Sequence, residues 1–333
     1  MPRFGLFGAG RIGRMHARNL ASIPGVDLAY VYDVHEPSAA AAGEDTGAAV
    51  ARDPDEVLND AAVDAVFIAS STDTHCDLIE RSVAAGKTVL CEKPIHLDIT
   101  RVEQCRQAIG DGSDRVQIAF NRRFDPNHLA VKRAIESGEL GRLEKLILTS
   151  RDPAPPPLDY IKVSGGLFRD MMIHDFDLAR FLMGEEPVEV TAMASAIISD
   201  EIRDAGDIDT AMVVMRMESG ALCHINCSRR CSYGYDQRVE AFGSEGMVLE
   251  NNPTATTVER WGETSTSARE PLLHFFIERY ADSYLAEVRA FVDAVSKGEP
   301  PSPAFEDGRR ALILANAALQ SLQTGQAVKV NYA

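Results

Sequence analysis

The chain has 333 residues, of which 45% are hydrophobic, so it can bury a large core and is expected to form two domains. Its formal net charge of -16 disfavours nucleic acid or an anionic membrane surface as a partner. No apolar run approaches the roughly 20 residues that a membrane-spanning helix needs, and no basic leader precedes the first predicted strand, so we expect a cytoplasmic protein.

The first predicted strand, Phe4–Phe7, runs into a glycine-rich turn of the pattern G-x-G-x-x-G, formed by Gly8, Gly10 and Gly13. The first glycine permits a tight turn, the second lets the backbone approach a pyrophosphate, and the third lets the next helix pack closely on the sheet. A second strand, Val26–Tyr32, ends at Asp33, whose carboxylate can bind ribose hydroxyls and repel a 2′-phosphate. The segment therefore predicts NAD rather than NADP, although the glycines alone also fit a purely structural turn.

Strands and helices continue to alternate through the first 120 residues. A helix begins near His75 and stops at Gly86, and another is expected over Asp98–Ile109. The strands of this region are short and almost continuously apolar, as expected when both faces of a parallel sheet are covered; they lie at 64–69, 88–91 and 116–120. This alternation predicts a doubly wound parallel sheet in an α/β fold, with a dinucleotide-binding Rossmann domain over residues 1–120.

The alternation ends after residue 120, and residues 121–333 are expected to form a second, α+β domain for substrate binding and oligomerisation. Helices are predicted over 126–137, 168–182, 280–297 and 306–322, and strands over 143–150, 188–198, 209–217, 221–229, 236–242 and 247–250. Several short strands joined by hairpin-like turns indicate an open, mostly antiparallel sheet. The proline-rich loop Asp152–Asp159 cannot pair within a sheet, so we expect it at a domain edge or cleft.

Three cysteines in the predicted strand region invite a metal-binding interpretation, because Cys223, Cys227 and Cys231 are regularly spaced. Zinc sites usually carry C-x-x-C spacings, however, and alternation along a strand would place Cys223 and Cys227 on one buried face. We therefore expect core residues and no metal. Cys91 is similarly expected to be a packed strand residue rather than a nucleophile.

Chemistry is expected from two segments. Lys93, in Glu92-Lys93-Pro94, follows a predicted strand at the sheet edge where ligands bind; it either faces the nicotinamide or is a solvated turn lysine. Asp170 and His174 are four residues apart, so one helical face would bring a carboxylate and an imidazole together to move a proton. A helix cap and a structural histidine remain the alternative. Asp175 and Asp177 are expected either on a solvated face or in contact with neighbouring side chains.

A dinucleotide-binding turn, then Glu92-Lys93-Pro94, then an Asp-x-x-x-His segment resembles the glucose-fructose oxidoreductase, inositol dehydrogenase and rhizopine catabolism family over essentially the whole chain. Longer strings at 120–124, 164–182 and 233–243 most resemble the inositol 2-dehydrogenase branch. The resemblance implies NAD-dependent oxidation of a cyclic polyol, most simply myo-inositol to its 2-keto product. It also implies a homo-oligomer, expected to be a tetramer that pairs through the second-domain sheet.

The resemblance further implies roles for individual residues. Lys93, Asp170 and His174 form the catalytic set, with His174 as general base, Lys93 favouring the developing alkoxide and Asp170 fixing the histidine or a hydroxyl. Residues along the cofactor are, besides the three glycines, Arg11, Ile12, Asp33, Ser70, Ser71, Thr72, His75, Glu92, Lys93 and Asn121. His75 could equally be a helix-terminal residue that touches no ligand. Further candidates for polyol binding are Arg123, Asp152, Asp159 and Tyr235.

Two alternatives remain from the sequence. Within enzymes, the substrate could be scyllo-inositol, another cyclitol or a sugar, because epimers differ only in the direction of their hydrogen bonds. Outside enzymes, a regulatory protein could retain a nucleotide-binding domain. Such a protein would be expected to lack the combination of Lys93, Asp170 and His174, which this chain has.

Overall fold

The computed structural model describes residues 1–333, which form two compact units. The first contains Met1–Phe124 and Asp282–Leu312, and the second contains Asp125–Ala281 and Ile313–Ala333. The expected domains, 1–120 and 121–333, stay a prediction, but the units differ from them because the segment 282–312 belongs with the N-terminal part. No helix of the chain is both long and apolar enough to pass through a lipid bilayer.

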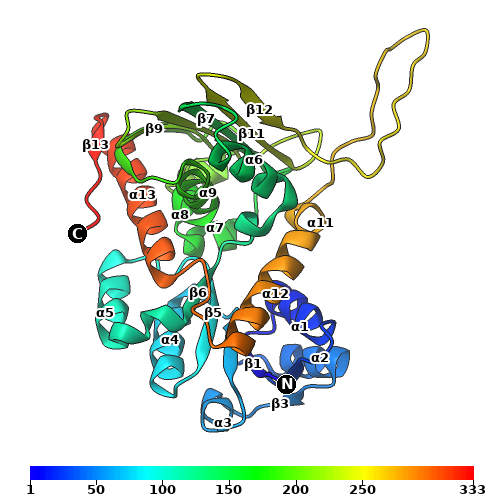
Figure 1. Cartoon of the computed structure of the whole chain (residues 1–333), viewed down its shortest axis with the longest axis vertical. Helices are drawn as coiled ribbons and strands as arrows, with labels where there is room; N and C mark the ends of the chain where they lie inside the picture. The colour runs from blue at the N-terminus through cyan, green and yellow to red at the C-terminus, as the bar shows by residue number, and fades with distance from the viewer. The chain divides into compact units, whose positions relative to one another are not determined.

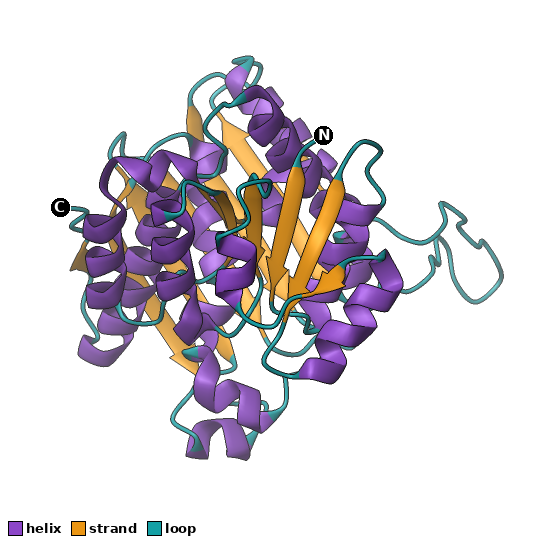
Figure 2. Cartoon of the chain, turned by 90° about the horizontal axis from the view of Figure 1, so that it is seen from below, coloured by secondary structure: helices purple, strands orange, loops and turns teal.

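The first unit is built on a six-stranded parallel sheet with the order β3-β2-β1-β4-β5-β6. Figure 2 shows the strands of the chain in orange and the helices in purple. The strand order reverses between β1 and β4, and ligands of such sheets bind outside the carboxyl ends at that point. The strands are β1 Arg3–Phe7, β2 Asp27–Tyr32, β3 Ala49–Val50, β4 Ala65–Ile68, β5 Thr88–Glu92 and β6 Val116–Ala119. The helices are α1 Arg11–Ala21, α2 Glu36–Thr46, α3 Pro54–Leu58, α4 His75–Ala84 and α5 Ile99–Ile109.

A late segment of the chain completes the core of this unit. Phe291, on helix α12 (Ala281–Lys297), stands edge-on to Phe67 of β4, with 5.2 Å between the ring centroids. Its ring lies 6.3 Å from that of Phe4 in β1, and all three side chains are fully buried. Periodicity located this helix, but it carries no signal of the sheet on which a helix packs.

The second unit contains a seven-stranded sheet with the order β12-β11-β7-β10-β9-β8-β13, in which only β7 and β10 are parallel. Its strands are β7 Leu143–Arg151, β8 Pro187–Ser195, β9 Thr210–Met217, β10 Leu222–Ser228, β11 Asp236–Gly243, β12 Met247–Glu250 and β13 Val328–Lys329. The α/β fold class, with a Rossmann sheet and an open, mostly antiparallel second sheet, is thus confirmed.

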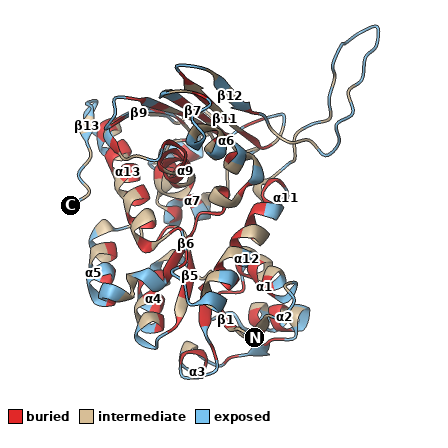
Figure 3. Ribbon diagram, viewed as in Figure 1, coloured by how far each residue is buried: buried red, intermediate tan, exposed pale blue.

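One face of the second sheet packs on helices. The core there joins alternate strand residues, including Cys223 and Cys227, to apolar side chains of α6 (Pro126–Glu136), α9 (Ile173–Met183) and α13 (Phe305–Thr324). The expected core position of these two cysteines is confirmed, and Cys231 is buried as well. The opposite face lacks such cover (Figure 3), and its exposed apolar side chains are Val188, Met193, Met212, Val214, Leu222, Met247 and Leu249.

The helix expected over 168–182 is wrong as a single element. It is two helices, α8 (Gly166–Asp170) and α9, separated by a turn at Met171 and Met172. Both of these backbone N–H groups donate to the carbonyl oxygen of Leu167, which closes α8 before α9 begins. Helices not named from the sequence are α2 and α3 in the first unit and, in the second, α7 Leu158–Ser164, α10 Asp200–Asp204 and α11 Phe276–Arg279.

Candidate active site

The glycine turn between β1 and α1 has the geometry that its sequence demands. Gly8 has φ +92°, a left-handed conformation that favours glycine, and its N–H donates to the carbonyl oxygen of Tyr32 at 2.8 Å. A Cβ on Gly13 would lie 1.9 Å from the carbonyl oxygen of Gly8, so any side chain there would push α1 away from the turn. These two glycines are therefore required by the protein's own packing.

Gly10 is different, because a Cβ there would meet no protein atom within 4 Å. Gly10 caps the N-terminus of α1 without a side-chain hydrogen bond, so the first N–H groups of that helix face open space. Such a terminus attracts anions through its N–H groups and its helix dipole. The space over Gly10 thus fits the pyrophosphate of a dinucleotide, and Arg11 and Ile12 begin the helix beside it.

Asp33, directly after β2, contacts the same turn. Its Oδ2 accepts a hydrogen bond from the N–H of Ala9 at 2.6 Å, and its Oδ1 accepts one from the N–H of His35 at 2.8 Å. Each carboxylate oxygen has two lone pairs, so both can still accept from ribose hydroxyls. The sequence pattern pointed to the residue but not to its bond with the turn.

Ser70, Ser71 and Thr72 follow β4 and lead through a short 3₁₀ turn into α4, where the hydroxyls of Ser70 and Thr74 are 2.6 Å apart. His75 begins α4 and is buried. Its Nδ1 lies 2.9 Å from the carbonyl oxygen of Pro94, and its Nε2 lies 3.1 Å from that of Ser70. Burial lowers the pKa of this imidazole. His75 therefore connects the end of β4 to the segment that follows Lys93.

Lys93 follows β5 and is half-buried, in a segment held from two sides. On one side His75 meets Pro94; on the other, Nε2 of the fully buried His16 lies 2.9 Å from a carboxylate oxygen of Glu92. Nothing in the sequence pattern pointed to His16, since a histidine on a helix has no partner until the sheet is folded. Burial raises the pKa of the Cys91 thiol, which keeps it protonated and agrees with a packing role.

Asn121 lies in a 3₁₀ turn after β6 and is 2% exposed. Its Nδ2 is buried and has no hydrogen-bond partner in the protein. A buried donor without an acceptor is costly, and an amide or ribose group of a bound cofactor would satisfy it. The open space over Gly10 and this donor are the two observations that fit NAD to the first unit.

Asp170 and His174 belong to the second unit. Asp170 ends α8; its Oδ1 accepts a hydrogen bond from the Tyr160 hydroxyl at 2.8 Å, and its Oδ2 lies 3.5 Å from Nη2 of Arg229. Arg229 is 1% exposed, so this charge pair is well shielded from water. Tyr160 and Arg229 were not singled out from the sequence, although both stand next to predicted residues or strand ends.

His174 lies in the first turn of α9. It is half-buried, while its neighbours from Met171 to Arg180 are buried, so it is the one side chain of this stretch within reach of a ligand. Asp175 and Asp177 are each 1% exposed, so of the two expected surroundings the solvated face is wrong and contacts to neighbouring side chains are found. Asp177 lies 3.6 Å from the buried guanidinium of Arg180, and such a partner allows a carboxylate to be buried.

The remaining predicted substrate residues have diverse surroundings. Arg123 lies in the first unit and donates to a carboxylate oxygen of Asp307 at 2.8 Å. In the second unit, the Asp159 side chain is 99% exposed, and the Asp152 N–H donates to the carbonyl oxygen of Ser228. Tyr235 is buried, with its ring centroid 6.0 Å from that of Tyr280.

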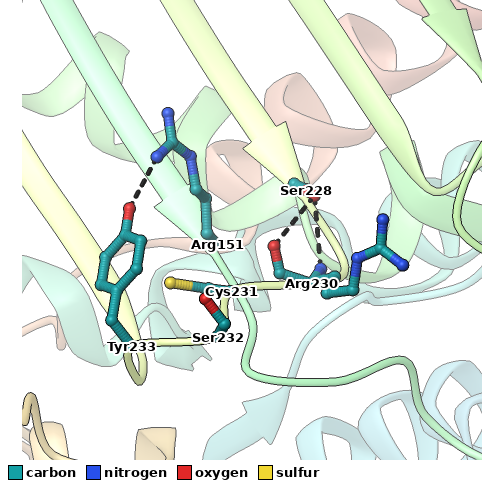
Figure 4. A pocket seen from close by; sticks show the side chains of 6 residues that line it. All are labelled: Arg151, Ser228, Arg230, Cys231, Ser232 and Tyr233. Carbon is teal, nitrogen blue, oxygen red and sulfur yellow. Dashed lines mark hydrogen bonds between the residues drawn. The ribbon is translucent and has the colours of Figure 1, made fainter.

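A cavity of about 310 Å³ opens at the ends of β7 and β10 in the second unit (Figure 4). Its lining holds two arginines and consists of Arg151, Ser228, Arg230, Cys231, Ser232 and Tyr233. The Tyr233 hydroxyl accepts from Arg151 and donates to the buried carboxylate of Asp236, both at 2.8 Å. Burial and this carboxylate raise the pKa of Tyr233, so its hydroxyl stays a hydrogen-bond donor. Since Asp236 takes the single proton of Tyr233, the N–H donors that the cavity offers to a hydroxyl group are those of Arg151 and Arg230.

A buried cluster of Asp125, His128 and Glu250 has ligand atoms within 4.8 Å of one another, close enough to hold a metal ion. Arg279 already supplies a positive charge there, because its Nη1 lies 2.6 Å from Asp125 and its Nη2 lies 3.0 Å from Glu250. His128 Nδ1 lies 2.6 Å from the other oxygen of Glu250. The guanidinium satisfies both carboxylates, so the cluster is an ion-pair network of the second unit.

Comparison with known proteins covers both units. Residues 2–120 match the oxidoreductase family with an NAD-binding Rossmann fold, and residues 128–249 match the GFO/IDH/MocA C-terminal domain. The chain is 47% identical over 329 residues to the myo-inositol 2-dehydrogenase of Thermotoga maritima, covering 98% of each chain.

Solved structures agree with this. A myo-inositol dehydrogenase from Corynebacterium glutamicum superposes with a TM-score of 0.96 at 47% identity, covering 99% of each chain. A scyllo-inositol dehydrogenase from Lactobacillus casei, with bound NAD(H) and scyllo-inositol, superposes with a TM-score of 0.91 at 30% identity, covering 99% of this chain and of that one.

Proposed function

The chain belongs to the GFO/IDH/MocA family of oxidoreductases with an NAD-binding Rossmann fold, and we propose that it oxidises myo-inositol to the 2-keto product with NAD as hydride acceptor. It is an NAD-dependent dehydrogenase of the inositol 2-dehydrogenase type. The observation that carries the substrate proposal is similarity at 47% identity across both units to proteins that act on myo-inositol. Similarity to the scyllo-inositol enzyme is lower, at 30% identity.

Oxidation of a secondary alcohol removes a hydride from carbon and a proton from the hydroxyl. Bound NAD supplies the hydride acceptor. We assign the proton to His174, because an imidazole has an ordinary pKa of about 6.5 and can accept it near neutral pH. Lys93 is assigned to the alcohol oxygen, whose growing negative charge a cation stabilises. Asp170 orients His174 or an adjacent hydroxyl, and Tyr160 and Arg229 hold its carboxylate.

A neutral ring with six hydroxyls offers no charge to bind, so recognition requires many hydrogen bonds. Asp152, Asp159, Arg123 and Tyr235 are proposed to supply them. Tyr160 joins this set, since its hydroxyl already bonds Asp170 and its side chain is 47% exposed. A sugar with one hydroxyl missing or inverted would leave buried groups unpaired, at about 1–3 kcal/mol each.

The substrate is tested by steady-state kinetics with NAD on myo-inositol, scyllo-inositol, D-glucose and D-xylose, followed by the absorbance of NADH. We expect the highest kcat/KM for myo-inositol. A higher value for scyllo-inositol or an aldose would remove the substrate assignment and leave the dehydrogenase. No NADH formation with any polyol, from protein that binds NAD, would favour a regulatory role instead.

We further propose that the protein is a homo-oligomer, a tetramer by family resemblance, that pairs through the uncovered face of the second sheet. Met193 is 77% exposed and Met212 is 54% exposed on neighbouring strands, in direct register with one another. Adjacent exposed apolar side chains of this kind favour a protein interface. Met212→Glu should yield smaller species in sedimentation, whereas Val50→Glu, on the first unit, should not.

A cytoplasmic location is also proposed. Its support is that all six cysteines are free thiols and buried, which fits a reducing compartment.

A further inference from the structure

Between β12 and α11 the chain forms a long arm, defined here as residues 252–274, that projects from the second sheet (Figure 1). None of residues 251–278 is buried, whereas Glu250 and Arg279 on either side are. The arm is therefore anchored at both ends in the unit and contributes nothing to the unit's core.

The arm is nevertheless ordered along its length. Arg260 and Ala268 exchange two backbone hydrogen bonds of 2.8 and 3.1 Å, and a further isolated bridge joins Thr254 to Leu272 at its base. The N–H of Gly262 donates to the carbonyl oxygen of Ser265 and closes the tip. A lone two-stranded ribbon is marginal in water, because ordering its backbone costs about 1–2 kcal/mol per residue without core burial to offset it.

The arm carries both charged and large apolar side chains, and the two groups differ in their surroundings. Four of its five charged side chains pair across the ribbon: Arg269 donates to Glu259 at 2.6 Å, and Arg260 lies 3.7 Å from Glu270. The fifth, Glu263, is exposed near the tip. The arm's large apolar side chains have no such cover, since Trp261 is 70% exposed and Val258 is 52% exposed. A tryptophan is the side chain that most often anchors a protein interface. The ribbon thus presents apolar groups while four of its five charged side chains neutralise one another.

We propose that the arm packs on a second copy of this chain, with Trp261 as its anchor. The inference rests on the self-association proposed above. The arm begins just after β12, whose Met247 and Leu249 belong to the uncovered apolar face of the sheet. It is therefore continuous with the surface proposed to pair between copies. The net charge of -16 makes unpaired carboxylates unfavourable between two copies, and two of the arm's three carboxylates, Glu259 and Glu270, are paired within the arm.

Trp261 is the only tryptophan of the chain, so tryptophan fluorescence reports on the arm alone. The full-length protein is diluted stepwise while its mass is followed by sedimentation and its tryptophan by emission wavelength and acrylamide quenching. We expect shielded, short-wavelength emission in the assembled protein. The emission should shift to longer wavelength, and quenching should rise, with the same midpoint concentration as dissociation.

The variant Trp261→Glu should weaken self-association by about 30-fold or more, the scale of a lost interface anchor. Val50→Glu places the same charge on a 47% exposed apolar position of the first unit and should associate like the wild type. Circular dichroism of both variants checks that they fold.

The possible results distinguish a role of the arm from self-association through the sheet alone. An assembled protein whose tryptophan is fully quenchable, or whose Trp261→Glu variant assembles normally, overturns the arm proposal and leaves sheet pairing intact. Shielded tryptophan in the dissociated chain also overturns it, because the arm would then pack on its own subunit. A protein that stays monomeric at every concentration overturns both proposals.

Discussion

The carboxylate of Asp33 accepts a hydrogen bond from the N–H of Ala9, with 2.6 Å between oxygen and nitrogen. The residue expected to select the cofactor by its charge is thereby also a support of the glycine turn to which we assign the pyrophosphate. Substitution of Asp33 consequently changes both the adenosine end of the site and the turn itself, and variants must separate the two effects.

We expect Asp33→Ser combined with Val34→Arg to shift preference from NAD to NADP. Val34 is 88% exposed, so an arginine there has room to meet a 2′-phosphate. The loss of hydrogen bonds to a charged group, about 1.5–3 kcal/mol, should lower kcat/KM for NAD by about tenfold to a hundredfold. Asp33→Asn keeps an oxygen for Ala9 without the charge and isolates the electrostatic part. Wild-type protein that uses NADP as well as NAD would contradict the assignment.

Gly10→Ala should impair NAD binding, whereas Gly13→Ala should impair the stability of the fold. A Cβ at Gly10 meets no protein atom, so this variant should keep the wild-type Tm while losing NAD binding. A Cβ at Gly13 would lie 1.9 Å from the backbone of Gly8, so that variant should lose about 1–3 kcal/mol of unfolding free energy even without NAD. Calorimetric unfolding and NAD titration measure both quantities. Equal NAD affinity in Gly10→Ala and wild type would rule out a pyrophosphate there.

Lys93→Ala and His174→Ala should each reduce kcat by about a hundredfold or more, the usual scale for an acid–base group or a partner of an oxyanion. NAD binding should survive, because neither side chain is assigned to the phosphates or ribose. Lys297→Ala, which removes a lysine at an exposed position, is the control. Near-normal turnover in a folded Lys93 or His174 variant would eliminate its role.

His75 should make the protein less stable in mild acid. Burial lowers its pKa in the folded state, whereas the unfolded chain takes up the proton near pH 6.5. The free energy of unfolding therefore does not suffer from His75 above about pH 6.5. It falls as the pH drops from there towards the folded pKa, by at most about 1.4 kcal/mol per pH unit. Urea denaturation from pH 7.5 to 5.5 should show a smaller fall for His75→Asn than for wild type. Parallel slopes for the two proteins would refute this.

A chelator should leave both turnover and Tm unchanged. The one buried group of potential metal ligands, Asp125, His128 and Glu250, already surrounds the guanidinium of Arg279. A fall in Tm after treatment with EDTA, reversed by added zinc, would show that this network holds a metal.

The strands of the first unit were predictable because the burial of each strand shows in its own sequence. Residues Ala65–Ile68 are buried on both faces, and such a run is apolar without alternation. The turn residues Gly8 and Asp33 were predictable for a similar reason, since their backbone and charge requirements act at fixed offsets from a strand. His16 and Arg229 were not, because their carboxylate partners are brought to them only by folding.

The spacing of Asp170 and His174 led to a wrong local structure. Periodicity continues through Met171 and Met172, which are themselves buried, so the sequence shows no interruption of the helix. The interruption comes from a shared acceptor, the carbonyl oxygen of Leu167, and backbone bonds leave no mark on the pattern of side chains. The arm at 252–274 is the opposite case: its polar sequence fits any loop, and its ribbon depends on pairs such as Glu259 with Arg269.

The position of Phe291 in the first unit sets the order in which the protein can be completed during synthesis. Phe4 and Phe67 leave the ribosome early, but the ring that packs against both is separated from them by most of the second unit. Domains usually fold as units as they emerge, N-terminal ones first. Here the nascent nucleotide-binding sheet must wait, with an apolar face open, until α12 has been translated. A chain truncated before α12 should accordingly depend on chaperones or aggregate, even though it contains every strand of that sheet.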